Sequence, residues 1–136
     1  MSDELTAFIH RAMPLSATLG IRCTRTDADG VDLELDWAPA LCTSAGLLHG
    51  GTVMALADTA GGALAFANLP DGANGTSTIE SKTNFLRGAR SGTVRAQARV
   101  LHAGGTTIVV ETEIRDDTGR LLAKTTQTQA VLRPRA

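Results

Sequence analysis

The longest apolar run in the chain restricts its fold more than any other feature. Residues 51–68 read GTVMALADTAGGALAFAN, in which Ala, Leu and Met favour a helix, and Leu69, Pro70 and the Asp71-Gly72 pair end it. The run is apolar on nearly every side, so the helix is expected to be buried. The face of a single sheet cannot cover such a helix all round. We therefore expect part of it to contact a second copy of the chain.

The remaining segments read mainly as β-strands. Residues 31–37 alternate strictly between apolar and acidic side chains, as a strand with one buried face does, and the Asp29-Gly30 pair before them suits a hairpin turn. Glycine-containing turns separate three later runs and indicate an antiparallel meander. One sheet and one long helix predict an α+β fold in a single domain spanning residues 1–136. The expected elements are a short helix at 3–13, strands at 20–26 and 31–37, the central helix at about 51–68, and strands at 76–86, 93–101, 106–115 and 121–132.

Composition excludes several functions. The formal charge of −1 and the absence of Tyr, with a single Trp, argue against nucleic acid or an anionic membrane as a partner. Cys23 and Cys42 stand alone, and His10, His49 and His102 lack the spacing of metal ligands. We therefore expect reduced thiols, no metal and no other cofactor. The first residues lack a secretory pattern, so we expect a cytoplasmic protein.

Asp58 is the anomaly within the apolar helix. A carboxylate in such a segment is costly unless it is paired, and Asp does not favour helix interiors. It is there either for function or for a structural hydrogen bond to a neighbouring loop. Gly61 and Gly62 follow on the same helical face, where they either leave open space beside the carboxylate or allow two helices to pack closely.

A second group of residues, His49-Gly50-Gly51, opens the same helix. Glycines at a helix start expose backbone N–H groups, and the partial positive charge there stabilises an oxyanion on an acyl carbonyl. A loop that needs glycine for its backbone angles, with His49 as a cap, also accounts for the motif. Gly50 and Asp58 are separated by eight positions, or about 12 Å along a helix. To act on one thioester they must come from two helices packed antiparallel, across a dimer interface.

Together these residues resemble a known family. Gly46-Leu47-Leu48-His49-Gly50-Gly51 and Leu56-Ala57-Asp58-Thr59-Ala60, with Asn84-Phe85-Leu86 and the Gly104-Gly105 turn, are similar to the hotdog-fold acyl-CoA thioesterases of the phenylacetate-pathway type. The resemblance implies a curved antiparallel sheet wrapped around the long helix, with subunits paired as homodimers and commonly homotetramers. It also implies hydrolysis of acyl- or aryl-CoA thioesters without metal, coenzyme A being part of the substrate.

The same resemblance implies roles for single residues. Asp58 would be the nucleophile or the general base for water, the Gly50 N–H of the neighbouring subunit would polarise the thioester carbonyl, and Thr78 would position water or the carboxylate. Family members usually have Asn six positions before the His, where this chain has Thr43, whose hydroxyl is shorter. We place His49 with these catalytic candidates.

We expect the substrate to be bound by glycines that leave space for the acyl group and by cations near the entrance of the active-site pocket. Small residues at Gly61, Gly62 and Ala65 suggest room for a bulky or aromatic acyl group. The phosphates of CoA need positive charge, for which Arg87, Arg90 and Lys124 are candidates. The predicted substrate-binding residues are Gly51, Gly61, Gly62, Arg87 and Arg90.

Two other functions stay open. A hotdog enoyl-CoA hydratase or dehydratase also pairs a His with an acid, but the Pro-Gly helix entry of those enzymes is missing here. The second is an acyl-CoA-binding module without catalysis. Thr43 favours that module, whereas Asp58 disfavours it, because a pure binder does not need a buried carboxylate.

Overall fold

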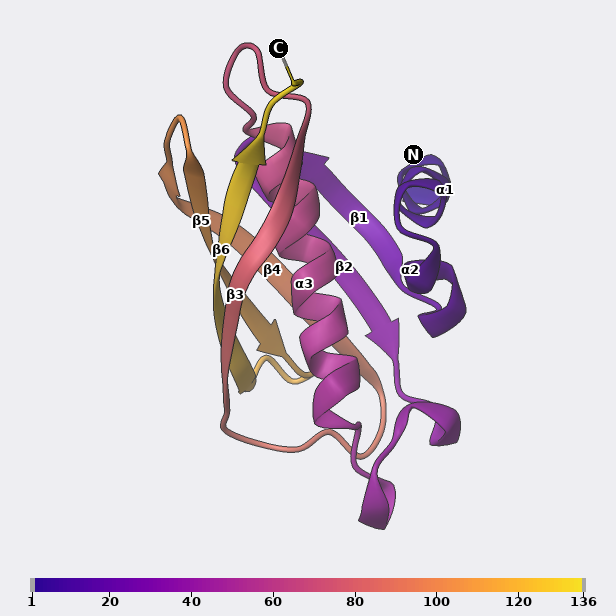
Figure 1. Cartoon of the computed structure of the whole chain (residues 1–136). Helices are drawn as coiled ribbons and strands as arrows, with labels where there is room; N and C mark the ends of the chain where they lie inside the picture. Colours follow the sequence, from indigo (N-terminus) through magenta and orange to yellow (C-terminus); the bar gives the residue numbers. More distant parts are fainter. Residues whose placement is uncertain (1, 136) are drawn as a thin grey trace.

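A computed structural model describes residues 2–135, which form one long helix packed against a six-stranded antiparallel sheet (Figure 1). The predicted α+β architecture and the order of its main elements are confirmed. The structure adds a second short helix, which begins at Pro14, and two short 3-10 turns before the long helix. The elements are α1 (Ser2–Ala12), α2 (Pro14–Leu19), β1 (Arg22–Asp27), β2 (Gly30–Asp36), the 3-10 turns η1 (Pro39–Leu41) and η2 (Ser44–Gly46), α3 (Gly50–Ala67), β3 (Gly75–Phe85), β4 (Thr93–Ala103), β5 (Thr107–Arg115) and β6 (Leu121–Leu132).

The strands lie in the order β1-β2-β4-β5-β6-β3, and every pairing is antiparallel. Strands β4, β5 and β6 form the predicted meander. The strand that follows the long helix, β3, lies at the far edge and pairs with β6, while β2 pairs with β4 on the other side. The sheet curves around α3, which lies in its concave face (Figure 1).

Alternation along the strands gives the sheet one buried and one wet face. Val31, Leu33 and Leu35 of β2 are fully buried, whereas the acidic residues between them point outward into ion pairs such as Glu34 with Arg95 at 2.9 Å. The same alternation occurs along β4, where Val94, Ala96 and Ala98 are buried. Because the inward side chains of the strands and of α3 share one cluster, the core lies between the sheet and the helix.

Helix α3 is buried on only one side. Asp58 and Phe66 lie on the uncovered side, and Phe66 is 56% exposed. The expectation that the Asp58 carboxylate is buried is therefore wrong for the single chain, because the sheet covers only part of the helix circumference. The buried residues of α3 are Val53, Leu56, Ala57, Thr59, Ala60, Gly61, Leu64 and Ala65.

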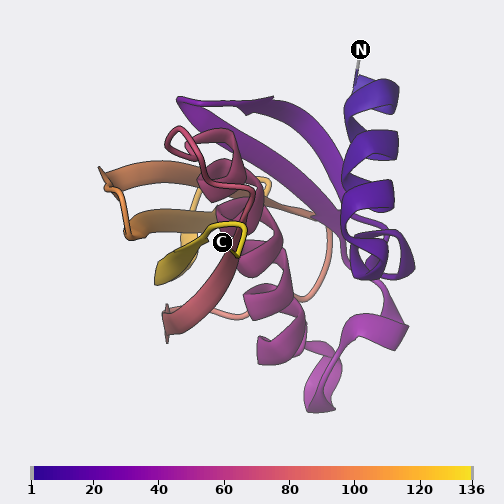
Figure 2. The ribbon, with the colours of Figure 1, turned by 45° about the horizontal axis from the view of Figure 1, so that its top comes forward.

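Helix α1 packs beside β1, at the edge of the sheet opposite to β3 (Figure 2). Ile9 is the fully buried anchor of its apolar face, while Phe8 beside it is 47% exposed. The ring of His10 is fixed by a 2.7 Å hydrogen bond with the Ile21 carbonyl. Within residues 2–135, no helix is long and apolar enough to cross a membrane.

Strand β3 leaves an uncovered edge. It runs for 11 residues, most of them exposed, and its outer edge has no neighbouring strand within the described chain. Ile79 is 63% exposed and lies at a bulge between Thr78 and Glu80. Proteins usually cover or blunt an edge of this length, since its unpaired N–H and C=O groups can pair with another chain.

Candidate active site

The Asp58 carboxylate lies halfway along α3 and is held by two strands. Its Oδ1 atom accepts hydrogen bonds from Thr78 Oγ1 on β3 and from Gln127 Nε2 on β6, both at 3.1 Å. No residue of the described chain donates to the other oxygen, Oδ2. Hydrogen bonds to an ionised acceptor are stronger than neutral ones, so two donors orient the carboxylate firmly. One oxygen is thus satisfied and the other is free.

Two buried glutamines on β6 complete this network. Gln127 and Gln129 are 1% and 2% exposed. The Nε2 atom of Gln129 donates to Thr78 Oγ1 at 2.6 Å and to Gln127 Oε1 at 3.2 Å. Gln129 therefore fixes both of the side chains that donate to Asp58. Neither glutamine is among the residues predicted from the sequence. The available signal was the period of two along β6, which places both on the same face as the buried Ala123.

Gly61 and Gly62, which follow Asp58 on α3, have different surroundings. A Cβ added to Gly61 would lie 1.9 Å from Gln127 Oε1, so the space beside Gly61 is filled by that amide. A Cβ added to Gly62 would meet nothing within 4 Å. The expected open space therefore exists beside Gly62 and not beside Gly61, and Ala65 is fully buried in the core. Gly61 makes room for Gln127 rather than for a substrate.

This difference predicts opposite effects of one substitution at adjacent positions. Gly62→Ala is expected to raise the free energy of unfolding by about 1 kcal/mol, since Ala is the better helix former. Gly61→Ala is expected to lower it by about 1–3 kcal/mol, because the new methyl group overlaps the Gln127 amide. Urea unfolding of both variants at one protein concentration measures the two changes. Equal effects at the two positions would contradict the packing described.

A groove runs past Asp58 between α1 and β3. Its volume is 490 Å³, within the range of small-molecule sites, and its walls are mostly apolar. Phe8 and Phe66 contribute aromatic rings, and Gly62 contributes the open stretch of helix. The groove is lined by Phe8, Ile9, Ala12, Met13, Asp58, Gly62, Ala63, Phe66, Gly75, Thr76, Ser77, Thr78 and Gln129.

The start of α3 presents a free backbone donor. His49 caps the helix, its Nδ1 atom accepting a 2.7 Å hydrogen bond from Gly51 N–H, and its carbonyl accepts from the N–H groups of Thr52 and Val53. The Gly50 N–H has no partner within residues 2–135. It lies at the positive end of the helix dipole. His49 thus orders the first turn and leaves the Gly50 N–H available.

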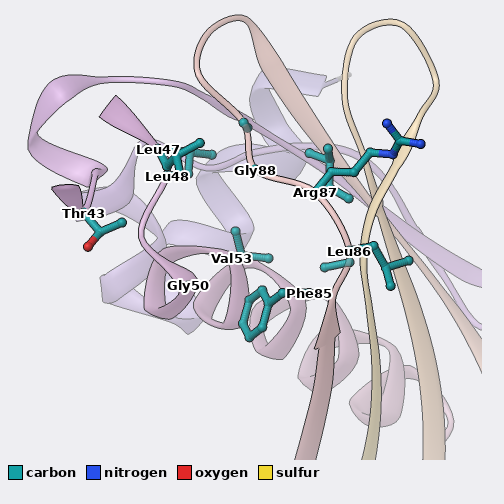
Figure 3. Close-up of a pocket in the computed structure, with 12 residues that line it drawn as sticks. Thr43, Leu47, Leu48, Gly50, Val53, Phe85, Leu86, Arg87 and Gly88 are labelled. Carbon is teal, nitrogen blue, oxygen red and sulfur yellow. The ribbon is translucent and has the colours of Figure 1, made fainter. Parts of the chain in front are cut away.

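A second cavity, of 370 Å³, opens beside Gly50 (Figure 3). The Phe85 ring lies next to Gly50 and Val53, and Leu47 and Leu48 form the opposite wall. A Cβ added to Gly50 would lie 3.3 Å from Phe85 Cζ, so glycine allows the close approach of this ring. The cavity is therefore an apolar hollow with one backbone donor at its edge.

Two of the other predicted residues line this cavity. Thr43 lines it and is exposed, with its N–H donating to the Leu47 carbonyl at 2.8 Å. Arg87 also lines it, and its side chain extends away from the helix (Figure 3). Arg90 donates to the Ala45 carbonyl at 2.9 Å. Lys124 instead forms an ion pair with Glu111, so its charge is already compensated.

The candidate residues therefore form two separate groups. Asp58 and Thr78 line the groove, whereas Gly50 and Thr43 line the cavity. His49 lies next to Gly50 as the cap of α3. Both groups are carried by α3, eight residues or about 12 Å apart along its axis. Neither pocket contains both Asp58 and Gly50. In one chain the Asp58 carboxylate and the Gly50 N–H are too far apart to act on the same thioester carbonyl group.

Comparison with known proteins identifies similar chains. The family model described as "Thioesterase superfamily" matches residues 45–123. A Mycobacterium tuberculosis protein named as a candidate esterase, Rv1847, is 31% identical over 90% of this chain and 89% of its own length. Its solved structure covers 91% of this chain and all (100%) of the matched chain, with a TM-score of 0.87 and 30% identity. This agreement confirms the expected fold, a curved sheet around a long helix.

Two further relatives carry more specific names. The 1,4-dihydroxy-2-naphthoyl-CoA hydrolase of Escherichia coli is 36% identical over 64% of this chain and 63% of its own. A candidate thioesterase of Ralstonia eutropha, described as related to phenylacetic acid degradation, has a solved structure with a TM-score of 0.79 and 30% identity. That match covers 88% of this chain and 90% of the other.

Proposed function

The chain belongs to the thioesterase superfamily, and from that premise we propose that it hydrolyses acyl-CoA or aryl-CoA thioesters to the free acid and CoA. The observation that carries this proposal is the Asp58 carboxylate at the wall of an apolar groove. It is fixed through one oxygen, and no residue within 2–135 donates to the other. A thioester enzyme needs a general base or a nucleophile at the acyl carbon, and Asp58 is suited to either role.

Asp58 has two routes to the same products. As general base it takes a proton from water, and the hydroxide attacks the acyl carbon; the tetrahedral intermediate then collapses, the C–S bond breaks, and the CoA sulfur receives a proton. As nucleophile, a carboxylate oxygen bonds to the acyl carbon and expels CoA, and water then cleaves the mixed anhydride. Thr78 orients the carboxylate in both routes.

The negative charge that develops on the carbonyl oxygen needs a donor, and we assign this to Gly50. Its N–H has no partner within the described chain and lies at the positive end of α3. His49 contributes by capping the first turn, which keeps that N–H directed outward. Thr43, at the same cavity, is the candidate for holding water or substrate.

The site is proposed to form between two copies of the chain. A two-fold arrangement with antiparallel α3 helices would bring Asp58 of one copy to Gly50 of the other, which one chain cannot do over about 12 Å. The uncovered edge of β3 and the exposed side of α3 are the surfaces for this contact. Such a homodimer would carry two equal sites, and pairs of dimers would give a homotetramer.

The acyl group is proposed to be bulky or aromatic. Both pockets are lined mainly by apolar side chains, and aromatic rings lie in each: Phe85 at Gly50, and Phe8 and Phe66 near Asp58. One relative is named as the hydrolase of a naphthoyl-CoA. We assign the contacts with the CoA phosphates to Arg87, which lines the Gly50 cavity, and to Arg90.

Thiol release from a panel of acyl- and aryl-CoA compounds tests this function. We expect kcat/KM for benzoyl-, phenylacetyl- and naphthoyl-CoA to exceed that for acetyl- and butyryl-CoA by about 10-fold or more, since burying a ring is worth several methylene groups. Poor hydrolysis of the aryl compounds relative to short linear ones would contradict the acyl assignment. Binding of these compounds with no thiol release would instead indicate an acyl-CoA-binding module.

A further inference from the structure

We infer that Gln127, held in place by Gln129, is a positioning residue that fixes the Asp58 carboxylate through Oδ1 and so makes Oδ2 the oxygen that reacts. The inference rests on the proposed function and adds to it a residue and a distinction between the two carboxylate oxygens. It is carried by the hydrogen bonds of four side chains: Asp58, Thr78, Gln127 and Gln129.

The direction of every hydrogen bond in this network is determined. An ionised carboxylate only accepts, so the end of the Gln127 amide that faces Asp58 is the NH2 group. The Gln127 oxygen then faces Gln129, which must donate to it. Gln129 also donates to the Thr78 oxygen, which leaves the Thr78 hydroxyl hydrogen for Asp58. All donors therefore point toward one carboxylate oxygen.

Burial makes this arrangement rigid. Gln127 and Gln129 are almost fully enclosed, so an amide that turned away from its partner would lose a hydrogen bond that water could not replace. The missing side chain at Gly61 provides the volume in which the Gln127 amide lies. The sequence thus provides both the amide and the space it occupies.

The chemical consequence concerns which oxygen meets the substrate. Oδ1 accepts two hydrogen bonds and lies toward β3 and β6, so it is the poorer base and nucleophile. Oδ2 accepts none from residues 2–135 and keeps its lone pairs for a proton of water or for the acyl carbon. Donors fixed before the reaction do not have to reorganise during it, and such preorganisation lowers the barrier.

Kinetics of Gln127→Met test the inference. Met has a similar length and cannot donate, so we expect kcat to fall about 10- to 100-fold. We expect KM to stay within about two-fold, because Gln127 lines neither the groove nor the cavity. Gln97→Met is the matched control, since Gln97 lies on the outer face of β4 between the buried Ala96 and Ala98. An unchanged kcat in folded Gln127→Met would overturn the inference.

A double-substitution cycle separates positioning from general damage. If Gln127 acts through the carboxylate, then adding Gln127→Met to Asp58→Asn leaves the residual rate unchanged. If Gln127→Met instead lowers the rate of Asp58→Asn by the same factor by which it lowers the rate of the wild type, then Gln127 acts independently of the carboxylate. That result would overturn the inference.

Two further results keep the test decisive. If Gln127→Met does not fold, Gly61→Ala can be used instead, because the added methyl group displaces the Gln127 amide. We expect this variant to have a lower kcat as well, and an unchanged kcat in Gly61→Ala would contradict the positioning role. Wild-type protein that releases no thiol would refute the proposed function itself. If the wild type is active, Asp58→Asn is inactive and Gln127→Met is as fast as the wild type, then only the positioning role is refuted.

Discussion

Asp58→Asn is expected to lower kcat for thioester hydrolysis about 1,000-fold or more, with almost no change in the free energy of unfolding. Asparagine has the same shape, and its oxygen still accepts hydrogen bonds from Thr78 and Gln127. It can neither take a proton from water nor attack the acyl carbon. Because Asp58 is exposed in the single chain, removing its charge costs the core nothing.

Thiol release and urea unfolding, measured side by side, check this result. Asp29→Asn is the matched control, because Asp29 lies exposed in the turn between β1 and β2, far along the chain from either pocket lining. A folded Asp58→Asn protein that retains most of its activity would place catalysis elsewhere in the molecule.

Gly50→Pro is expected to lower kcat about 100- to 1,000-fold, because proline lacks the N–H that would stabilise the oxyanion. We expect the fold to tolerate this change. Proline is favoured in the first position of a helix, and His49 already has the extended backbone, φ −61° and ψ 137°, that a residue before proline adopts. The N–H that is lost has no partner within the described chain.

Gly50→Ala separates the donor from the added carbon. Both variants introduce a Cβ at 3.3 Å from the Phe85 ring, but only alanine keeps the N–H. The ratio of their kcat values therefore measures what the N–H contributes. Equal rates for the two variants would show that the Gly50 N–H does not take part.

Mixing the two inactive proteins distinguishes a shared site from one within a single chain. A dimer of one Asp58→Asn chain and one Gly50→Pro chain would contain one intact site, built from the unaltered Gly50 and the unaltered Asp58. Random pairing in equal amounts would recover about a quarter of the wild-type activity per chain. No recovery in mixtures shown to exchange subunits would contradict the composite site.

The fold could be predicted largely from local patterns. The strict alternation along residues 31–37, the length of the apolar run that became α3, and the glycine turns between β4, β5 and β6 all reflect short-range rules of backbone and side-chain geometry. Pro14 shows the limit of such rules. It ends one helix and also begins the next, because proline fits a first helical turn.

The site was predictable only in part. Asp58 is conspicuous because a carboxylate in an apolar helix is unusual, and His49-Gly50-Gly51 is conspicuous as a helix start. Gln127 and Gln129 are 69 and 71 positions from Asp58. Gln129 meets Thr78 through the pairing of β3 with β6, and Gln127 meets Asp58 through the packing of α3 against β6. The role of Gly61 depends on that same long-range contact, so no pattern within the helix could indicate it.

The uncovered edge of β3 has a consequence for the protein in the cell. An 11-residue strand whose outer edge has no neighbouring strand within residues 2–135 invites uncontrolled pairing with other chains and is a hazard for aggregation. A dimer closed over this edge would remove the hazard and complete the two active sites in the same step. Dilution would then affect catalysis and solubility together. A chain that dissociates from its partner would lose its catalytic activity and would expose the strand edge that quality-control proteases and chaperones recognise.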